Sequence, residues 1–211
     1  MSIGLKGNAD GSGAIQIGGS DAITITTGLN TTFLGTATVP TGTLYPLVSS
    51  TVNAGGTNPF PSSAGPTSVD YTNLPSWVKR ITIMFSGVSV SGTDSVILRL
   101  GTGAGPTYAS TGYANGNVFF NGATVGSYNN PTTGFFLTAG SSAAGLNHGV
   151  ATLALVSGTV WAISGSIMMS GATRGITLGG SLDAGAALTA IRFVTETTNT
   201  FDAGSINILY E

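Results

Sequence analysis

The sequence of 211 residues contains no cysteine, one histidine and few charged side chains. The absence of cysteine excludes disulfide bridges, thiolate metal sites and thiol nucleophiles. No apolar run approaches the roughly 18 consecutive residues that a membrane-spanning helix needs, and the first residues lack the apolar segment of a secretion signal. We therefore expect no membrane insertion, and a fold that is held by packing or by association between copies.

Charge is the scarcest property of the chain. Asp, Glu, Lys and Arg make up 7% of the residues, against about 25% in an average domain. The six basic residues are scattered, with only Lys79 and Arg80 adjacent. This pattern offers no positive patch for a phosphate backbone, so no nucleic-acid partner is predicted. Solubility must rest on Ser, Thr, Asn and Gly, and low charge is typical of surfaces that are buried between subunits.

Glycine is abundant, with 33 residues, and follows no Gly-X-Y period, which excludes collagen. It interrupts most windows of helical length, and its spread among β-branched residues predicts tight turns between strands. The clearest strand covers residues 79–86, where Ile81, Ile83 and Phe85 share one face. The pattern predicts an all-β fold, an antiparallel β-sandwich or jelly-roll-like module.

Two hairpins are predicted from strands that flank short turns. Residues 94–100 follow the strand at 79–86 after a turn at 90–93, and residues 150–156 and 160–169 flank the turn Ser157-Gly158-Thr159. Further strands are expected at 134–138, 175–178, 188–195 and 205–210.

Several of these strands carry apolar residues on both faces, such as Ile97, Val194 and Leu209. Two explanations stay open from alternation alone. The outer face packs on a neighbouring subunit, or these are single exposed apolar residues without meaning. The low charge of the chain favours the subunit interface.

The composition divides the chain in two. Residues 40–66 are rich in Pro, Gly and Asn and are expected to be loops or linkers. Before them, short β-like stretches at 14–17 and 22–26 flank Gly18-Gly19-Ser20, in a region too small for a core of its own. We interpret residues 1–43 as an N-terminal arm that orders by docking, or alternatively as edge strands of the main domain, and residues 44–211 as a β-sandwich module.

Two stretches resemble a known family. Residues 75–89 read PSWVKRITIMFSGVS, and residues 201–211 read FDAGSINILYE. Both are similar to a module at the C-terminal end of tail fibres and related virion proteins of tailed bacteriophages, and residues 45–51 are similar to the start of that module. The resemblance implies a β-sandwich-like module of a virion appendage, a homotrimer, and a distal domain that binds cell-surface glycans. The chain departs from long fibres because it has no repetitive shaft and no coiled-coil heptads.

Candidate catalytic and metal sites are weak in this sequence. His148 lies next to Gly149, with no Gly-x-Ser-x-Gly elbow elsewhere, and is interpreted as a surface-loop residue. The eight acids are dispersed, and Asp94, Asp183 and Asp202 stand in turn-like contexts where Asp side chains accept hydrogen bonds from backbone N–H groups. We predict no enzyme, no cofactor and no metal site.

Glycan binding is the functional hypothesis that the residues themselves support. Residues 101–130 combine aromatic side chains with asparagines. Aromatic rings with a polar group, such as tyrosine, suit partly solvated binding sites. The alternative is that these residues pack under their own loop or at a subunit interface. The candidate glycan-binding residues are Tyr108, Tyr113, Asn115, Tyr128 and Asn129.

The sequence thus predicts a virion structural protein, assembled in the bacterial host cytoplasm. The first hypothesis is a short tail fibre or receptor-binding subunit that contacts host-surface glycan. Its arm would join it to other virion proteins of the tail, collar or capsid. The alternative is a capsid decoration or head-fibre protein that stabilises the shell, and a more distant one is a depolymerase of envelope polysaccharide. A homotrimer is expected in the first two cases.

Overall fold

The computed structural model describes residues 65–211 except 128–131, 139, 141–142 and 172–173, and before residue 65 only the backbone of five short strands. The described residues form strands β1 to β17 and no helix, and all their pairings are antiparallel. The predicted all-β antiparallel fold is therefore confirmed. A search of the same residues for a helix with the length and apolarity to span a membrane found none.

The chain divides into two compact units, Met1–Tyr45 and Pro46–Glu211. The first unit holds a four-stranded sheet in sequence order, formed by β1 (Ile3–Gly7), β2 (Gly13–Ile17), β3 (Ser20–Ile25) and β4 (Thr31–Phe33). The strands expected at 14–17 and 22–26 are confirmed as β2 and β3, which pair with each other. The function of residues 1–43 as an attachment arm stays a prediction.

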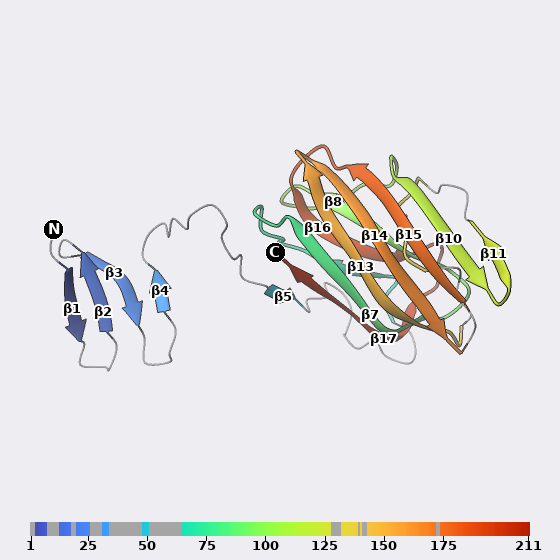
Figure 1. Cartoon of the computed structure of the whole chain (residues 1–211), viewed down its shortest axis with the longest axis horizontal. Coiled ribbons are helices and arrows are strands. Elements are labelled where there is room, and N and C mark those ends of the chain that lie inside the picture. The colour runs from blue at the N-terminus through green and yellow to red at the C-terminus, as the bar shows by residue number, and fades with distance from the viewer. Residues whose placement is uncertain are drawn as a thin grey trace. The chain divides into compact units, whose positions relative to one another are not determined.

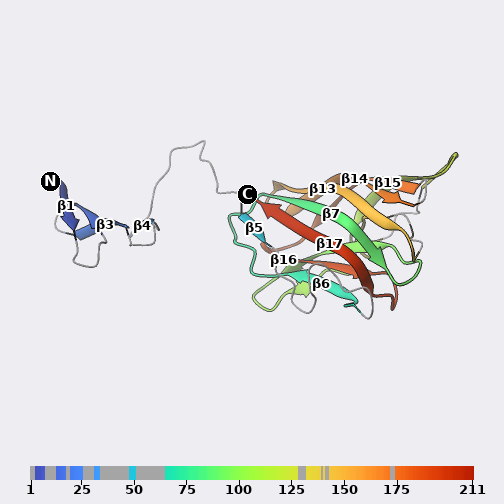
Figure 2. The ribbon, with the colours of Figure 1, turned by 90° about the horizontal axis from the view of Figure 1, so that it is seen from below.

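The second unit contains two sheets (Figures 1 and 2). The eight-stranded sheet runs in the order β11 (Thr124–Gly126), β10 (Ala114–Asn121), β15 (Arg174–Asp183), β14 (Val160–Ser170), β13 (Leu146–Ser157), β7 (Arg80–Val90), β17 (Phe201–Tyr210) and β5 (Val48–Ser50). The five-stranded sheet runs β12 (Phe135–Phe136), β8 (Val96–Thr102), β16 (Leu188–Thr195) and β6 (Ser68–Tyr71), with β9 (Thr107–Tyr108) paired to β8.

One hydrophobic core joins the two sheets in a sandwich-like arrangement. In β7, Ile81, Ile83 and Phe85 are buried and alternate with more exposed residues, as the period of two predicts. Phe85 meets Phe193 of the other sheet edge to face, with ring centroids 5.9 Å apart. The Tyr71 hydroxyl, also from the five-stranded sheet, donates a hydrogen bond of 2.5 Å to the Ile206 carbonyl in β17. Apolar contact and a buried hydrogen bond therefore both link the layers.

One of the two predicted hairpins is wrong. The hairpin of β13 and β14 around the turn at 157–159 is confirmed. The strands at 79–86 and 94–100 do not pair, because β7 lies between β13 and β17 while β8 belongs to the other sheet. Alternation of apolar residues shows which face of each strand points to the core. It does not show whether two consecutive strands pair in one sheet or lie in opposite sheets.

Two crossings between the sheets lie side by side and are tied together. The segment after β7 meets the segment between β16 and β17: Asp94 accepts hydrogen bonds of 2.8 Å from the N–H and the hydroxyl of Thr197, and Glu196 accepts one of 2.8 Å from the Ser95 N–H. Ser91 donates its N–H to the Thr200 carbonyl. The expectation that Asp94 caps backbone N–H groups is confirmed, although its partner comes from a distant segment.

Candidate functional site

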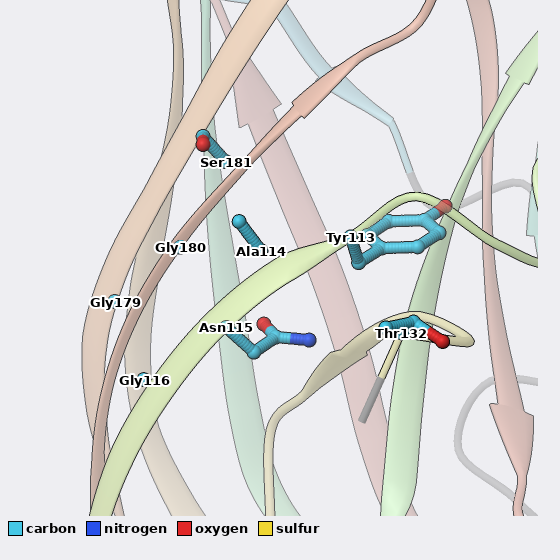
Figure 3. A pocket seen from close by; sticks show the side chains of 8 residues that line it. All are labelled: Tyr113, Ala114, Asn115, Gly116, Thr132, Gly179, Gly180 and Ser181. Atoms are coloured by element: carbon cyan, nitrogen blue, oxygen red, sulfur yellow. The ribbon is translucent and has the colours of Figure 1, made fainter. Parts of the chain in front are cut away.

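An open hollow of ≈ 470 Å³ lies along β10 and β15 (Figure 3). Asn115 pairs with Gly180 and Gly116 with Gly179 in the ladder between these strands. Because Gly116 and Gly179 face each other here, this part of the ladder has no side chains to fill the space. The lining residues are Tyr113, Ala114, Asn115, Gly116, Thr132, Gly179, Gly180 and Ser181.

Thr132 forms one wall of the hollow, and its segment, residues 132–134, is held by three hydrogen bonds. The Tyr113 N–H donates to the Thr132 carbonyl at 3.3 Å. The Arg99 Nε donates to the Thr133 carbonyl at 2.9 Å, and the Asn115 Nδ2 donates to the Gly134 carbonyl at 2.5 Å. This wall is thereby fixed to β8 and β10, so the hollow is largely preformed.

Tyr113 is a core residue, so its predicted role as an exposed platform for sugar is corrected. Its side chain is only 2% exposed, and its ring meets Phe135 edge to face at 4.8 Å. Its hydroxyl accepts a hydrogen bond of 2.8 Å from the Leu100 N–H and donates one of 3.2 Å to the Ala109 carbonyl. Burial raises the pKa of Tyr113 to about 12. The ring supports the hollow from beneath and presents no free face for stacking.

Because the Tyr71 and Tyr113 side chains are buried, we expect the protein to lose stability at alkaline pH. Burial raises the pKa values of Tyr71 and Tyr113 above the ordinary value of 10.0, so the folded state favours the neutral phenols. Their contribution to stability is fully present below pH 10.0 and is lost as the pH rises through about 12. We expect the midpoint of urea unfolding to fall between about pH 9 and about pH 11. In the Tyr113→Phe variant this fall should be smaller. An equal fall in the variant and the unmodified protein would show that ionisation of Tyr113 does not cause the loss of stability.

Tyr108 lies apart from the hollow, in β9 of the five-stranded sheet. The Arg192 guanidinium lies 4.0 Å above its ring centroid, and Arg192 makes two hydrogen bonds, of 2.7 and 2.6 Å, to the Asp70 carboxylate. Hydrogen bonding to Asp70 raises the pKa of Arg192, and burial raises that of Tyr108. One face of the Tyr108 ring is therefore occupied by a cation that is itself paired.

The structure brings two of the five candidate residues, Tyr113 and Asn115, to one hollow, and it leaves Tyr108 elsewhere. Tyr128 and Asn129 lie outside the described residues. Sequence reasoning missed Gly116, the Gly179-Gly180 pair and Ser181. The Gly179-Gly180 pair lies just after the strand predicted at 175–178, and the structure places it inside β15, where glycine marks a bulge or a site of close approach.

His148 is exposed as expected but lies within strand β13, so the loop assignment is corrected. Its Nδ1 accepts a hydrogen bond of 3.2 Å from the Gly87 N–H, and its Nε2 lies 3.4 Å from the Ser170 Oγ. Asp202 is in β17 rather than in a turn. Among the described residues, no three His, Cys, Asp or Glu side chains are grouped so that they could hold a metal ion.

The hollow is lined by uncharged groups. Its lining contains no Asp, Glu, His, Lys or Arg, and its one titratable group is the buried Tyr113 phenol, whose pKa is about 12. A proton donor or acceptor for catalysis needs a pKa near the working pH, so the hollow holds no such group near neutrality. Exposed Thr132 and half-buried Ser181 supply hydroxyls, which both donate and accept hydrogen bonds.

Comparisons of the chain with protein-family models, with curated proteins and with solved structures gave no match. The likeness to tailed-phage fibre modules stays a prediction from the sequence, which rests mainly on residues 75–89 and 201–211. In the structure these two stretches supply the neighbouring strands β7 and β17, which pair along most of their length next to β5, the last strand of the eight-stranded sheet.

Proposed function

We propose that this chain is a structural protein of a tailed-phage virion, a short tail fibre or receptor-binding subunit that contacts a neutral host-surface glycan. The observation that carries the glycan contact is the preformed, uncharged hollow along β10 and β15. The likeness of residues 75–89 and 201–211 to fibre modules supports the virion context.

A neutral glycan suits the hollow for physical reasons. Its floor is formed largely by backbone, so a sugar ring can approach closely, and its rim offers hydroxyl groups from Thr132 and Ser181. No charged side chain in the lining would attract an ionic ligand. Small-ligand sites commonly combine a preformed concavity with a few well-placed polar groups. The same lack of acids leaves a depolymerase without the pair of carboxylates that glycoside hydrolysis generally uses.

The location of the chain in the particle tests this proposal against capsid decoration. A cryo-electron microscopy map of the intact virion should show the C-terminal unit exposed at the tail or collar. Density for this unit on the capsid surface would overturn the adhesin function and would favour stabilisation of the shell. In that case virions without the protein should stay infective but lose tolerance to heat or osmotic shock.

Filling the hollow should abolish glycan binding without unfolding the protein. A Cβ atom on Gly116 would lie 4.0 Å from its nearest neighbour, the Gly179 carbonyl oxygen, so Gly116→Leu fits its backbone site and occupies the hollow. On an array of bacterial surface polysaccharides, we expect binding to weaken at least about tenfold, which corresponds to about 1.4 kcal/mol.

Gly105→Leu is the matched control, because a Cβ atom on Gly105 meets nothing within 4 Å and this residue does not line the hollow. It should bind as the unmodified protein does. Equal binding by all three proteins would show that any glycan is bound elsewhere.

A further inference from the structure

A second, smaller pocket of ≈ 160 Å³ lies where three segments of the C-terminal unit meet. They are residues 76–79, which lead into β7, residues 155–161 at the β13–β14 turn, and residues 186–188 at the start of β16. The pocket shares no lining residue with the hollow along β10 and β15. It is therefore separate from the site of the proposed function.

Backbone hydrogen bonds tie the three walls of this pocket to one another. Each bond joins residues that lie in two different segments or next to them. The bonds run from N–H to carbonyl oxygen, from Leu155 to Lys79 (2.8 Å), from Ala184 to Thr159 (3.0 Å) and from Leu74 to Thr189 (2.9 Å). Because each wall is bonded to both others, the pocket is preformed, and a ligand does not have to order its walls.

The interior of the pocket is apolar. Trp161, Leu188 and Val78 line it and are only 3%, 5% and 4% exposed, so each belongs to the hydrophobic core. A cavity of about 150 Å³ in a protein core is large enough to bind benzene. The pocket therefore has room for one six-membered ring or for a branched aliphatic group of similar size, and its apolar surface favours such a group over water.

Lys79 is the one charged residue in the lining of this pocket. It is exposed, and the ion pairs among the described residues use Arg80 and Arg192 instead. Its backbone is fixed by hydrogen bonds with Leu155 and Glu211. Its ammonium stands on a flexible four-carbon stem and has three N–H donors. Lys79 can therefore pair with an anion at the mouth of the pocket.

The other polar side chains of the lining are two hydroxyls. The Thr159 hydroxyl donates to the Asp183 Oδ1 at 2.6 Å, so its proton is already used. This bond, together with one of 2.9 Å from the Gly185 N–H, lowers the pKa of Asp183, whose carboxylate is outside the lining. Ser76 is exposed and lies in the same segment as Lys79. The side-chain donors at the rim are therefore the Lys79 ammonium and the Ser76 hydroxyl.

We propose that this pocket binds a compact organic monocarboxylate, with its hydrocarbon body against Trp161 and its carboxylate on Lys79. One ammonium balances one negative charge, and the two carboxylate oxygens accept hydrogen bonds from Lys79 and Ser76. A phosphate group suits the pocket less well, because it carries more charge and the rim has no arginine to bind it with two parallel hydrogen bonds. A neutral sugar would place hydroxyl groups against an apolar floor that cannot bond to them.

Titration of the full, ¹⁵N-labelled chain with benzoate tests this site by NMR, and benzyl alcohol is the neutral counterpart. We expect saturable shifts of the Trp161 indole N–H and of the backbone amides of residues 76–79 and 186–188. The dissociation constant should be on the order of 1 mM, as for a ligand of this size, and benzyl alcohol should bind at least about tenfold more weakly. The absence of saturable shifts at about 50 mM benzoate, or equal affinities for both compounds, would overturn the proposal.

Lys79→Met removes the charge and keeps an unbranched side chain at an exposed position, so the fold should not change. We expect its dissociation constant for benzoate to rise at least about tenfold, while the affinity for benzyl alcohol stays the same. Arg80→Met is the matched control, because it removes a positive charge from the next residue, which does not line the pocket. Its affinity for benzoate should stay within about twofold of that of the unmodified protein in physiological salt. Equal weakening in both variants, or none in Lys79→Met, would overturn the assignment of the carboxylate to Lys79.

Discussion

Replacing Phe193 by alanine is expected to lower the free energy of unfolding by about 4 kcal/mol, the usual cost when a large buried aromatic side chain is removed. Phe193 is fully buried in β16. Its ring meets Tyr71 within its own sheet and Phe85 in the opposite sheet, each with centroids 5.9 Å apart. The substitution would open a cavity between the two layers, where the surrounding strands cannot collapse to fill it.

Urea unfolding followed by tryptophan fluorescence measures this effect, because the buried Trp161 reports on the same core. Val194→Ala is the matched control: it is the next residue of β16, points to the outer side and is only half buried, so its loss should stay below about 1 kcal/mol. Similar losses for both variants would mean that the sheets do not pack through Phe193.

The sequence predicts strands well because burial imposes a period of two. Ile81, Ile83 and Phe85 were assigned to one face, and all three are buried in β7. Trp161, in the strand predicted at 160–169, is also buried. The order of strands could not be predicted in the same way. The pairing of β7 with β13 and β17 depends on segments far away in the chain, and alternation carries no information about partners.

The sequence also does not show which apolar residues on the outward faces of strands are exposed. Ile97 was a candidate for a subunit interface, but its side chain is covered by its own chain: a Cβ atom on Gly134 would lie 2.1 Å from Ile97 Cγ2. Val150 and Val118 remain exposed instead. Periodicity identifies the side of a strand on which a residue lies, and only the fold decides whether another segment covers that side.

The sequence predicted only part of the candidate site. Asn115 lines the hollow, whereas Tyr113 supports it from the core through a hydroxyl bonded to the backbone of Leu100 and Ala109. An aromatic residue near asparagines has the same sequence pattern whether its ring is a platform or a buried support. The glycines that create the hollow carry no chemistry of their own, so a search for functional side chains passes over them.

A close approach of two strands explains why glycine is needed in β17. Gly204 has a φ of 80°, and it faces Gly87 of β7, whose φ is 65°. The ladder between these strands shifts register on either side of Ala203. A Cβ atom on Gly204 would lie 2.2 Å from the carbonyl carbon and oxygen of Gly87 and 2.5 Å from the Val88 nitrogen. These are backbone atoms, so no rotation of a side chain relieves the clash.

Gly204→Ala should therefore lower the free energy of unfolding by about 3 kcal/mol or more, since it adds a backbone clash to the strain of a left-handed residue. Gly158→Ala isolates the strain alone: Gly158 has a φ of 54° in the β13–β14 turn, and a Cβ atom there meets nothing within 4 Å. Its loss should be about 1 kcal/mol. Urea unfolding of both variants measures the difference. Equal losses would mean that β7 and β17 separate at little cost, and that their close approach at Gly87 and Gly204 does not stabilise the sheet.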